Sequence, residues 1–252
     1  MTNNNKDIYG HVSSIVIDRE ECKNRLSISS NDDLEIESSV SSTPDDCIIS
    51  PIKSITNENP VVINLNSKKY SAKTIVRTLA SNVPLKKNFR RAGAIPYVST
   101  PRGRFYCLAL HNSGDLSDFG GQVEMQENYI MTVCRELKEE SEDIFDFTSK
   151  SSMQFMRENS IAIYDDKKNI ILFVKIECEN FNKLTNEFNK RIVLEDEPEN
   201  ISMFWVPEHL FITLYSQTNR YIDEEGRIYP KIYSTISGML KLLGNSDPLG
   251  LD

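Results

Sequence analysis

The sequence predicts an α/β domain in which strands pack against two amphipathic helices. Two observations lead to this prediction. Apolar, strand-like runs recur between residues 92 and 210, and two segments carry apolar side chains at helical spacing. The 252 residues are enough for one such domain with extensions. Because strands and helices alternate along the chain, we expect an α/β sandwich.

Five runs are typical of strands. The first two, at 92–99 (AGAIPYVS) and 105–111 (FYCLALH), are joined by the turn-forming sequence TPRGR. The next two, at 160–166 (SIAIYDD) and 169–177 (NIILFVKIE), predict a hairpin that turns around DDKK. A fifth run at 202–210 (SMFWVPEHL) is expected to be a strand that leads into a turn.

Helices are expected at about 128–142, where the apolar residues follow the spacing i, i+3, i+4 and i+7. The stripe that this helix would bury consists of Ile130, Val133, Cys134 and Leu137. The segment 230–244 predicts a core-facing helix with proline early and Gly244 as its C-cap. A shorter helix is predicted at 71–82, ending before Pro84.

The N-terminal part of the chain differs in composition from the rest. Residues 1–66 hold eleven Asp or Glu and five Lys or Arg, and 27–46 is rich in serine and acidic residues. Such a segment buries too little apolar surface to offset the entropy of ordering, so we expect 1–66 to be disordered or loosely packed. The short runs SIVI and VVINL within it resemble strands. We expect a short helix and basic lead-in at 67–87, and the main domain at 88–247.

Charge and cysteine content exclude several classes of protein. The net charge of −8 argues against generic nucleic-acid binding. The five cysteines lack zinc-site spacing, which indicates reduced thiols. No apolar run reaches the roughly 20 residues of a membrane span, and the first residues do not resemble a secretory signal. We therefore expect a cytoplasmic protein without a membrane partner.

One short segment, 118–145 (DFGGQVEMQENYIMTVCRELKEESEDIF), is unusually rich in carboxylates. Glu136, Glu139 and Glu140 are spaced i, i+3 and i+4, so they share one helix face. Like charges at this spacing cost roughly 0.2–0.5 kcal/mol per pair. The face is either simply solvated or a site for a hard divalent cation, for which carboxylate oxygens are the preferred ligands.

The spacing around these glutamates favours the cation site. Gly121 is followed after five residues by Glu127, and after seven more by Arg135-Glu136-Leu137-x-Glu139-Glu140. Through Glu140, this pattern matches every position of the Nudix box, G-x5-E-x7-R-E-U-x-E-E-x-G-U, where U is apolar. The chain thus resembles the Nudix hydrolases, through the box at 121–143 and the strand order over roughly 88–245. The resemblance implies an α/β/α sandwich with a mixed central sheet and a C-terminal helix.

The resemblance also implies a chemistry and a set of residues. Nudix enzymes use Mg2+ or Mn2+ to hydrolyse the pyrophosphate linkage of a nucleoside diphosphate joined to another group. The implied metal ligands are Glu136, Glu139 and Glu140, aided by the carbonyl of Gly121. Glu127 and Arg135 would be an ion pair that braces the loop against the helix, and these two complete the implied catalytic set. A general base outside the box would come from the acidic residues Glu195, Asp196, Glu197 and Glu199.

A basic run is the other candidate binding feature. Residues 85–104 hold six basic residues and no acid: Lys86, Lys87, Arg90, Arg91, Arg102 and Arg104. They form either a solubilising strip or a patch for a phosphate-rich ligand. We take Arg90, Arg91, Arg104 and Glu199 as candidate substrate-binding residues. Trp205 would either stack on a base or pack at a strand end.

The substrate class stays open at this point. A nucleotide or another small molecule with a diphosphate is the first expectation, and capped RNA or a diphosphoinositol polyphosphate is the alternative. Large DNA viruses encode Nudix decapping enzymes of similar size. Two non-enzymatic alternatives also stand, a Nudix-fold module that binds a nucleotide without cleaving it and a structural protein with a fortuitous box.

The end of the box departs from the family pattern. Where the box has glycine and then an apolar residue, this sequence has Glu142 and Asp143. The glycine normally lets the chain leave the helix in a left-handed conformation, which costs more for other residues. We therefore expect the helix to run slightly longer or to end in another kind of turn, with Ile144 or Phe145 supplying the apolar contact.

Overall fold

A computed structural model describes residues 48–49, 61–64, 74–178, 180–192, 198–217, 220–224, 226 and 228–250. The serine-rich segment 27–46 and the run SIVI lie outside the described residues. The strands are β1 (Ile48–Ile49), β2 (Val61–Asn64), β3 (Thr74–Leu79), β4 (Arg91–Thr100), β5 (Gly103–His111), β6 (Leu116–Ser117), β7 (Phe119–Gln122), β8 (Ser160–Asp165), β9 (Asn169–Glu177), β10 (Asn200–Pro207), β11 (Tyr221–Ile222) and β12 (Ile228–Tyr229). The helices are α2 (Tyr129–Glu140), α3 (Lys150–Glu158), α4 (Phe181–Ile192), α5 (Glu208–Ser216) and α6 (Ser234–Leu240), with 3-10 turns η2 (Ala80–Asn82) and η3 (Lys241–Leu243).

The main sheet is mixed, as the sequence predicts. Its strand order is β10-β5-β4-β9-β8-β3-β2, and β4 runs parallel to β9 while its other neighbours are antiparallel. Strand β4 pairs with β7 along its first half and with β5 along its second half. This arrangement places β7, which carries two consecutive glycines, beside the start of β4. The predicted hairpin is β8–β9.

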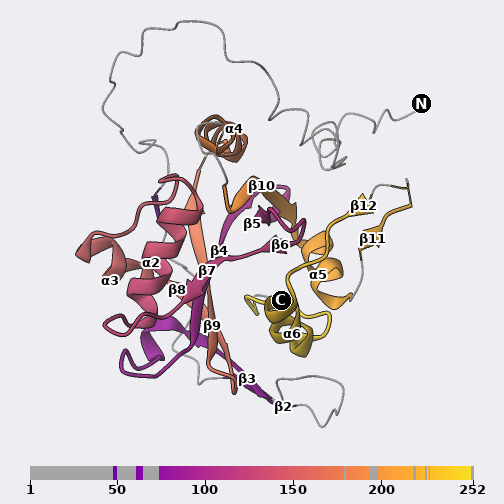
Figure 1. Ribbon diagram of the computed structural model, residues 1–252. Helices are drawn as coiled ribbons and strands as arrows, with labels where there is room; N and C mark the ends of the chain where they lie inside the picture. Colours follow the sequence, from indigo (N-terminus) through magenta and orange to yellow (C-terminus); the bar gives the residue numbers. More distant parts are fainter. Residues whose placement is uncertain are drawn as a thin grey trace, which may run out of the picture.

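Helices cover both faces of the sheet (Figure 1). One core joins α2, α3 and α4 to one face, and a second core joins α5 and α6 to the other. The predicted stripe of α2 is confirmed, since all four of its residues are buried in the first core. The α/β/α sandwich and the C-terminal helix expected from the sequence are therefore confirmed.

The predicted helix at 71–82 is wrong. Residues Thr74–Leu79 form strand β3, which lies between β2 and β8, and a 3-10 turn follows. Four of the six residues of β3 are β-branched, and such side chains favour the pleated sheet over the helix. Because β3 has a partner strand on each side, sheet pairing supplies backbone hydrogen bonds that a short isolated helix would have to supply itself.

The C-terminal helix starts later than predicted. It begins at Ser234, and Ile232 instead forms a parallel bridge with Leu116. Gly244 ends the helical segment with φ of 66°, as expected for a glycine C-cap. Three further helices, α3, α4 and α5, were not predicted, and α5 occupies the place of the expected turn after β10. Within the described part of the chain, none of the helices has the length and apolar composition of a membrane span.

Candidate functional site

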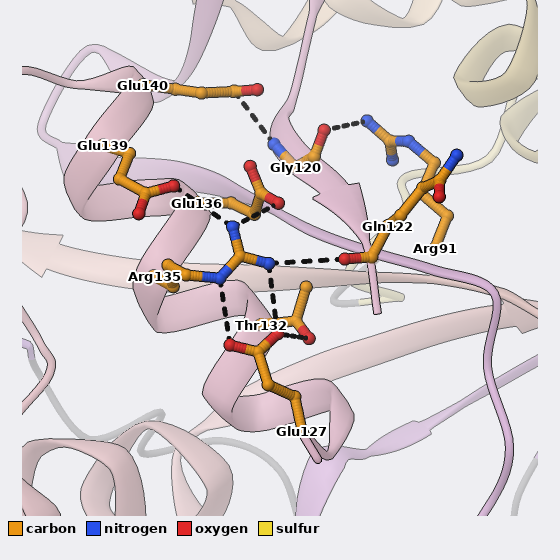
Figure 2. A network of polar contacts seen from close by, with 9 residues as sticks. All are labelled: Arg91, Gly120, Gln122, Glu127, Thr132, Arg135, Glu136, Glu139 and Glu140. Atoms are coloured by element: carbon orange, nitrogen blue, oxygen red, sulfur yellow. Dashed lines mark hydrogen bonds and ion pairs between the residues drawn. The ribbon is translucent and has the colours of Figure 1, made fainter. Parts of the chain in front are cut away.

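The candidate site lies where α2 packs against β7 (Figure 2). The side chain of Asn128 caps α2 by accepting hydrogen bonds from the backbone N–H groups of Ile130 and Met131, at 3.0 and 3.2 Å. The buried stripe fixes the rotation of the helix, because only one face can pack on the sheet. As a consequence, Glu136 and Glu140 point towards the two glycines of β7.

Arg135 links the loop to the helix. Its Nε and Nη2 lie 2.9 and 3.1 Å from the two carboxylate oxygens of Glu127. Its Nη1 donates to Glu136 Oε1 at 2.8 Å and to Glu139 Oε2 at 3.1 Å. Hydrogen bonds from Arg135 keep the pKa of Glu127 below its ordinary value, with a further bond from Thr132. The ion pair expected between Glu127 and Arg135 is therefore present, and Figure 2 shows it at the centre of the network.

Glu140 is the most deeply placed of the box glutamates. Its Oε2 accepts a hydrogen bond from the backbone N–H of Gly120 at 2.9 Å. Burial, followed by the negative charges of Asp118, Glu136 and Glu199, raises the pKa of Glu140 to about 9. Burial also raises the pKa of Glu136, against the opposing effect of Arg135. Without a cation, burial and the neighbouring carboxylates therefore favour the protonated form of Glu140.

A buried ion pair lies behind β7. Arg91 donates two hydrogen bonds to the fully buried Asp118, at 2.6 and 2.8 Å. Its Nη2 also donates to the carbonyl oxygen of Gly120 at 2.9 Å. Burial disfavours the charged guanidinium, but the carboxylate of Asp118 outweighs this effect and raises the pKa of Arg91. The sequence did not indicate this role, because no spacing rule connects Arg91 to Asp118.

Gly120 and Gly121 of β7 are required because β4 and α2 approach the backbone of β7 closely at these positions. A Cβ atom at Gly121 would lie 2.2 Å from Oε1 of Glu136, and one at Gly120 would lie 2.4 Å from the Cα of Gly93. Side chains at either position would push the strand away from α2 or from β4. The absence of side chains therefore brings the box glutamates against the backbone of β7.

The helix exit differs from the sequence-based expectation. Glu142 and Asp143 have φ of 54° and 60°, the left-handed region that glycine normally occupies. The N–H of Glu142 donates to the carbonyl of Glu139, and that of Asp143 donates to the carbonyl of Lys138. These two bonds form a Schellman motif. The expectation of a longer helix or another turn was therefore wrong, because neighbouring contacts hold Glu142 in the conformation of the missing glycine.

Two contacts secure this exit. Ile144 and Phe145 follow the turn and are buried, as the sequence predicts. In addition, Arg191 of α4 donates a hydrogen bond to the carbonyl oxygen of Glu142. The cost of a left-handed non-glycine residue, roughly 1–2 kcal/mol, is offset by the surrounding packing.

Besides Asp118, the structure brings Glu199, one of the acidic candidates from the sequence, near the box glutamates. Glu199 lies just before β10, with its side chain 66% exposed and Oε1 3.5 Å from Nε2 of His111. Its charge contributes to the raised pKa of both Glu136 and Glu140. The other members of the acidic stretch, residues 195–197, lie outside the described residues.

The basic candidates are separated from one another. Arg90 is exposed just before β4, whereas Arg91 is held behind β7 as described above. Arg104 lies elsewhere, where it pairs with Glu208 and Asp247. Trp205 is only 8% exposed and packs on Phe181 with ring centroids 5.1 Å apart, which is the strand-end packing alternative.

The described residues contain no group of three His, Cys, Asp or Glu side chains that is already arranged to hold a metal ion. Arg135 instead binds the carboxylates of Glu136 and Glu139. The donor set nevertheless fits a hard cation, because three carboxylates share one face of α2 and two of them have raised pKa values. The residues that could hold a cation are Glu136, Glu139, Glu140 and the backbone of Gly121.

Residues 119–140 form the strand, loop and helix that carry the sequence resemblance to the Nudix box. The chain folds as an α/β/α sandwich with a mixed sheet. A Caenorhabditis elegans Ap4A hydrolase is similar in structure, with a TM-score of 0.33 and 13% identity, over 62% of this chain and 95% of that one. A Bacillus subtilis pyrophosphohydrolase has a TM-score of 0.32 and 16% identity, over 68% and 89%. No protein-family model and no curated relative matches the sequence.

Proposed function

We propose that this protein is a divalent-metal-dependent hydrolase that cleaves the pyrophosphate linkage of a nucleoside diphosphate joined to another group. The observation that carries the proposal is the placement of Glu136 and Glu140 against the backbone of β7, with Glu139 on the same face. A diphosphate and this carboxylate face are both anionic. They can share one site only if cations lie between them.

Glu136, Glu139 and Glu140, with the carbonyl of Gly121, would hold Mg2+ or Mn2+. When bound, such an ion polarises the phosphoryl group and lowers the pKa of a water molecule. Glu127 holds Arg135 through two hydrogen bonds of its own. Glu136 and Glu139 can therefore turn to a cation while the brace between loop and helix stays in place.

Glu199 is our candidate for the group that orients water or accepts its proton. It comes from outside the box, it is exposed, and its charge acts on Glu136 and Glu140. A base must reach the reacting water and remain able to take a proton. A partly solvated carboxylate beside the metal ligands meets both requirements.

The substrate that we propose is a nucleotide or another diphosphate-containing small molecule. Capped RNA and a diphosphoinositol polyphosphate are the alternatives within the same reaction class. A binding module without activity had one supporting observation, the missing glycine of the box. Because Glu142 adopts the left-handed exit that the glycine would provide, that observation no longer favours it.

The test is hydrolysis of a nucleotide panel with Mg2+ or Mn2+, with products identified by mass spectrometry. We expect release of phosphate or a monophosphate from at least one substrate. Glu139→Gln and Glu140→Gln should each abolish turnover, whereas Glu158→Gln, an exposed glutamate of α3, should not change it. Tight nucleotide binding without turnover in the presence of either metal would refute the proposed hydrolase activity. Failure to bind either metal would indicate that the match to the box is fortuitous.

A further inference from the structure

A cluster of exposed cations lies beside the candidate site and is built from two distant segments. Lys86, Lys87 and Arg90 precede β4, and Lys167 and Lys168 form the turn between β8 and β9. All five side chains are exposed. We call these five residues the cationic cluster. The sequence alone indicated only the residues before β4, as part of the basic run at 85–104. Two other residues of that run, Arg91 and Arg104, are paired with carboxylates in the structure and do not belong to the cluster.

Backbone hydrogen bonds join the two segments. The N–H groups of Arg90 and Arg91 donate to the carbonyl of Lys168, at 2.7 and 3.4 Å. The turn itself is fixed by the buried Asp165, whose carboxylate accepts from the N–H groups of Lys167 and Asn169 and from the side chain of Asn169. The positions of the charges are therefore set by folded backbone.

Lys87 is also held by an aromatic side chain. Its Nζ lies 3.5 Å from the ring centroid of Tyr164 and 5.5 Å from that of Phe89. Such cation–π contacts restrict the ammonium group without neutralising it.

The charge of the cluster is not compensated by ion pairs. Within the described ranges, none of the five cations has a carboxylate oxygen within ion-pair distance. Asp165 is turned to backbone N–H groups, and Asp166 is the other acidic residue of the turn. By contrast, Arg91 and Arg104 each face a carboxylate. The cluster therefore offers net positive charge to solvent.

The cluster adjoins the loop that enters the box helix. The N–H of Val123 donates to the carbonyl of Arg90 at 3.1 Å, and Gln122 lies opposite Arg91 in the β4–β7 pairing. Gly121 is opposite Ala92, so Arg90 is two residues along the strand from the glycine beside Glu136. At about 3.3 Å per residue of strand, the distance from Arg90 to the residue opposite Gly121 is one or two phosphate spacings of a nucleic-acid strand.

We propose that the cationic cluster binds the phosphodiester backbone of a single-stranded nucleic acid whose end enters the site between α2 and β7. Small polyphosphates favour concave sites, whereas these side chains are all exposed, as suits a chain crossing the surface. A flexible single strand can place its end in the site and its next phosphates on the adjoining surface. The link to the site rests on the proposed function, while the binding itself does not.

The negative net charge of the protein does not prevent a nucleic acid from binding to the cationic cluster. At 0.1 M salt the screening length is about 10 Å, so the local cluster outweighs distant acidic residues. Each phosphate contact to a single strand contributes about 0.7 to the slope of log K against log salt. Loss of three lysines should therefore reduce the slope by about 2.

The first experiment measures binding without hydrolysis. A fluorescent single-stranded RNA of about 20 nucleotides with a 5′-hydroxyl end is titrated with the full chain between 50 and 200 mM salt, and anisotropy is read. The triple variant Lys86→Ala, Lys167→Ala and Lys168→Ala should bind about tenfold more weakly, with the reduced slope. The matched control, Lys150→Ala, Lys183→Ala and Lys190→Ala, removes the same charge from α3 and α4 and should stay within about twofold.

Several results would overturn the proposal. One is the absence of RNA binding by the unchanged protein. Another is an equal loss of RNA affinity in the control triple, since the net charge alone would then explain the loss. Binding of tripolyphosphate or of phosphatidylserine vesicles in place of RNA would assign the surface to a different partner.

A second measurement links the surface to the site. For RNA carrying a 5′-triphosphate, kcat/KM should fall about tenfold in the cluster triple, whereas kcat/KM for a nucleoside triphosphate should not change. An equal fall for both substrates would contradict the assignment. If the unchanged protein hydrolyses neither substrate, the proposed function fails. The binding measurement would still show whether the cationic cluster binds RNA.

Discussion

The backbone N–H of Gly120 donates a hydrogen bond to Oε2 of Glu140, with the two atoms 2.9 Å apart. The carbonyl oxygen of the same glycine accepts from Nη2 of Arg91, also at 2.9 Å. Arg91 is held in turn by the buried Asp118. A chain of contacts therefore runs from a buried ion pair, through one glycine, to a candidate metal ligand, and it makes Arg91 a positioning residue.

Arg91→Lys should lower kcat about tenfold with a smaller effect on KM. Lysine keeps the charge but loses the planar fork that contacts both Asp118 and Gly120, so Glu140 would no longer be held in one place. Steady-state kinetics and thermal unfolding would be measured together. Arg104→Lys is the matched control, because it alters another guanidinium held by carboxylates, those of Glu208 and Asp247, away from the site and should affect stability without lowering kcat. Equal kcat in both variants would contradict the role of Arg91.

Alanine at the two glycines of β7 should have different effects. Gly121→Ala places a methyl against the flexible end of Glu136, so we expect Mn2+ affinity to fall about tenfold with little loss of stability. Gly120→Ala places it against the backbone of β4, so we expect a loss of about 1–3 kcal/mol in unfolding free energy. Calorimetric metal titration and chemical denaturation measure the two effects. Similar profiles for both variants would show that the close approach to Glu136 is unimportant.

Glu142→Gly should stabilise the protein by about 0.5–1 kcal/mol, because glycine adopts the left-handed exit without the steric cost of a Cβ. The measurement is the free energy of unfolding from denaturant titration. Glu142→Ala is the control, since it keeps the Cβ and removes the carboxylate. If alanine stabilises as much as glycine, the charge and not the backbone conformation is responsible.

Metal-free protein should lose stability as the pH rises from about 5 to 9. Burial and the neighbouring carboxylates raise the pKa of Glu140 from 4.5 to about 9, so the folded state keeps a proton that the unfolded chain releases. This contribution is fully present below pH 4.5 and is lost as the pH passes through 9. Thermal unfolding across this range should show a weaker dependence in Glu140→Gln. Mg2+ should restore stability at high pH, and an unchanged slope in the variant would reject the assignment.

Local patterns predicted the strongly periodic elements and missed several others. The stripe of α2 was visible because its apolar residues repeat at helical spacing, and β4, β5, β8 and β9 because they are dense in apolar side chains. At 71–82 the spacing of Ile75, Val76 and Leu79 fitted a helix. Residues Thr74–Leu79 nevertheless form a strand, because they pair with β2 and β8. Helices α3 and α4 bury few residues completely, Met156 in α3 and Leu184 and Phe188 in α4, so their short apolar patterns gave little signal.

The sequence by itself determined the α/β class, the box and the group of glutamates on one helix face, because these depend on spacing within a few turns of chain. Only the tertiary structure decided which charges meet. It turned Arg91 inward to Asp118, placed Lys167 and Lys168 beside Arg90, and brought Glu199 to the box. It also held Glu142 in a left-handed conformation. Contacts between residues far apart in sequence set these features, and no local pattern encodes such contacts.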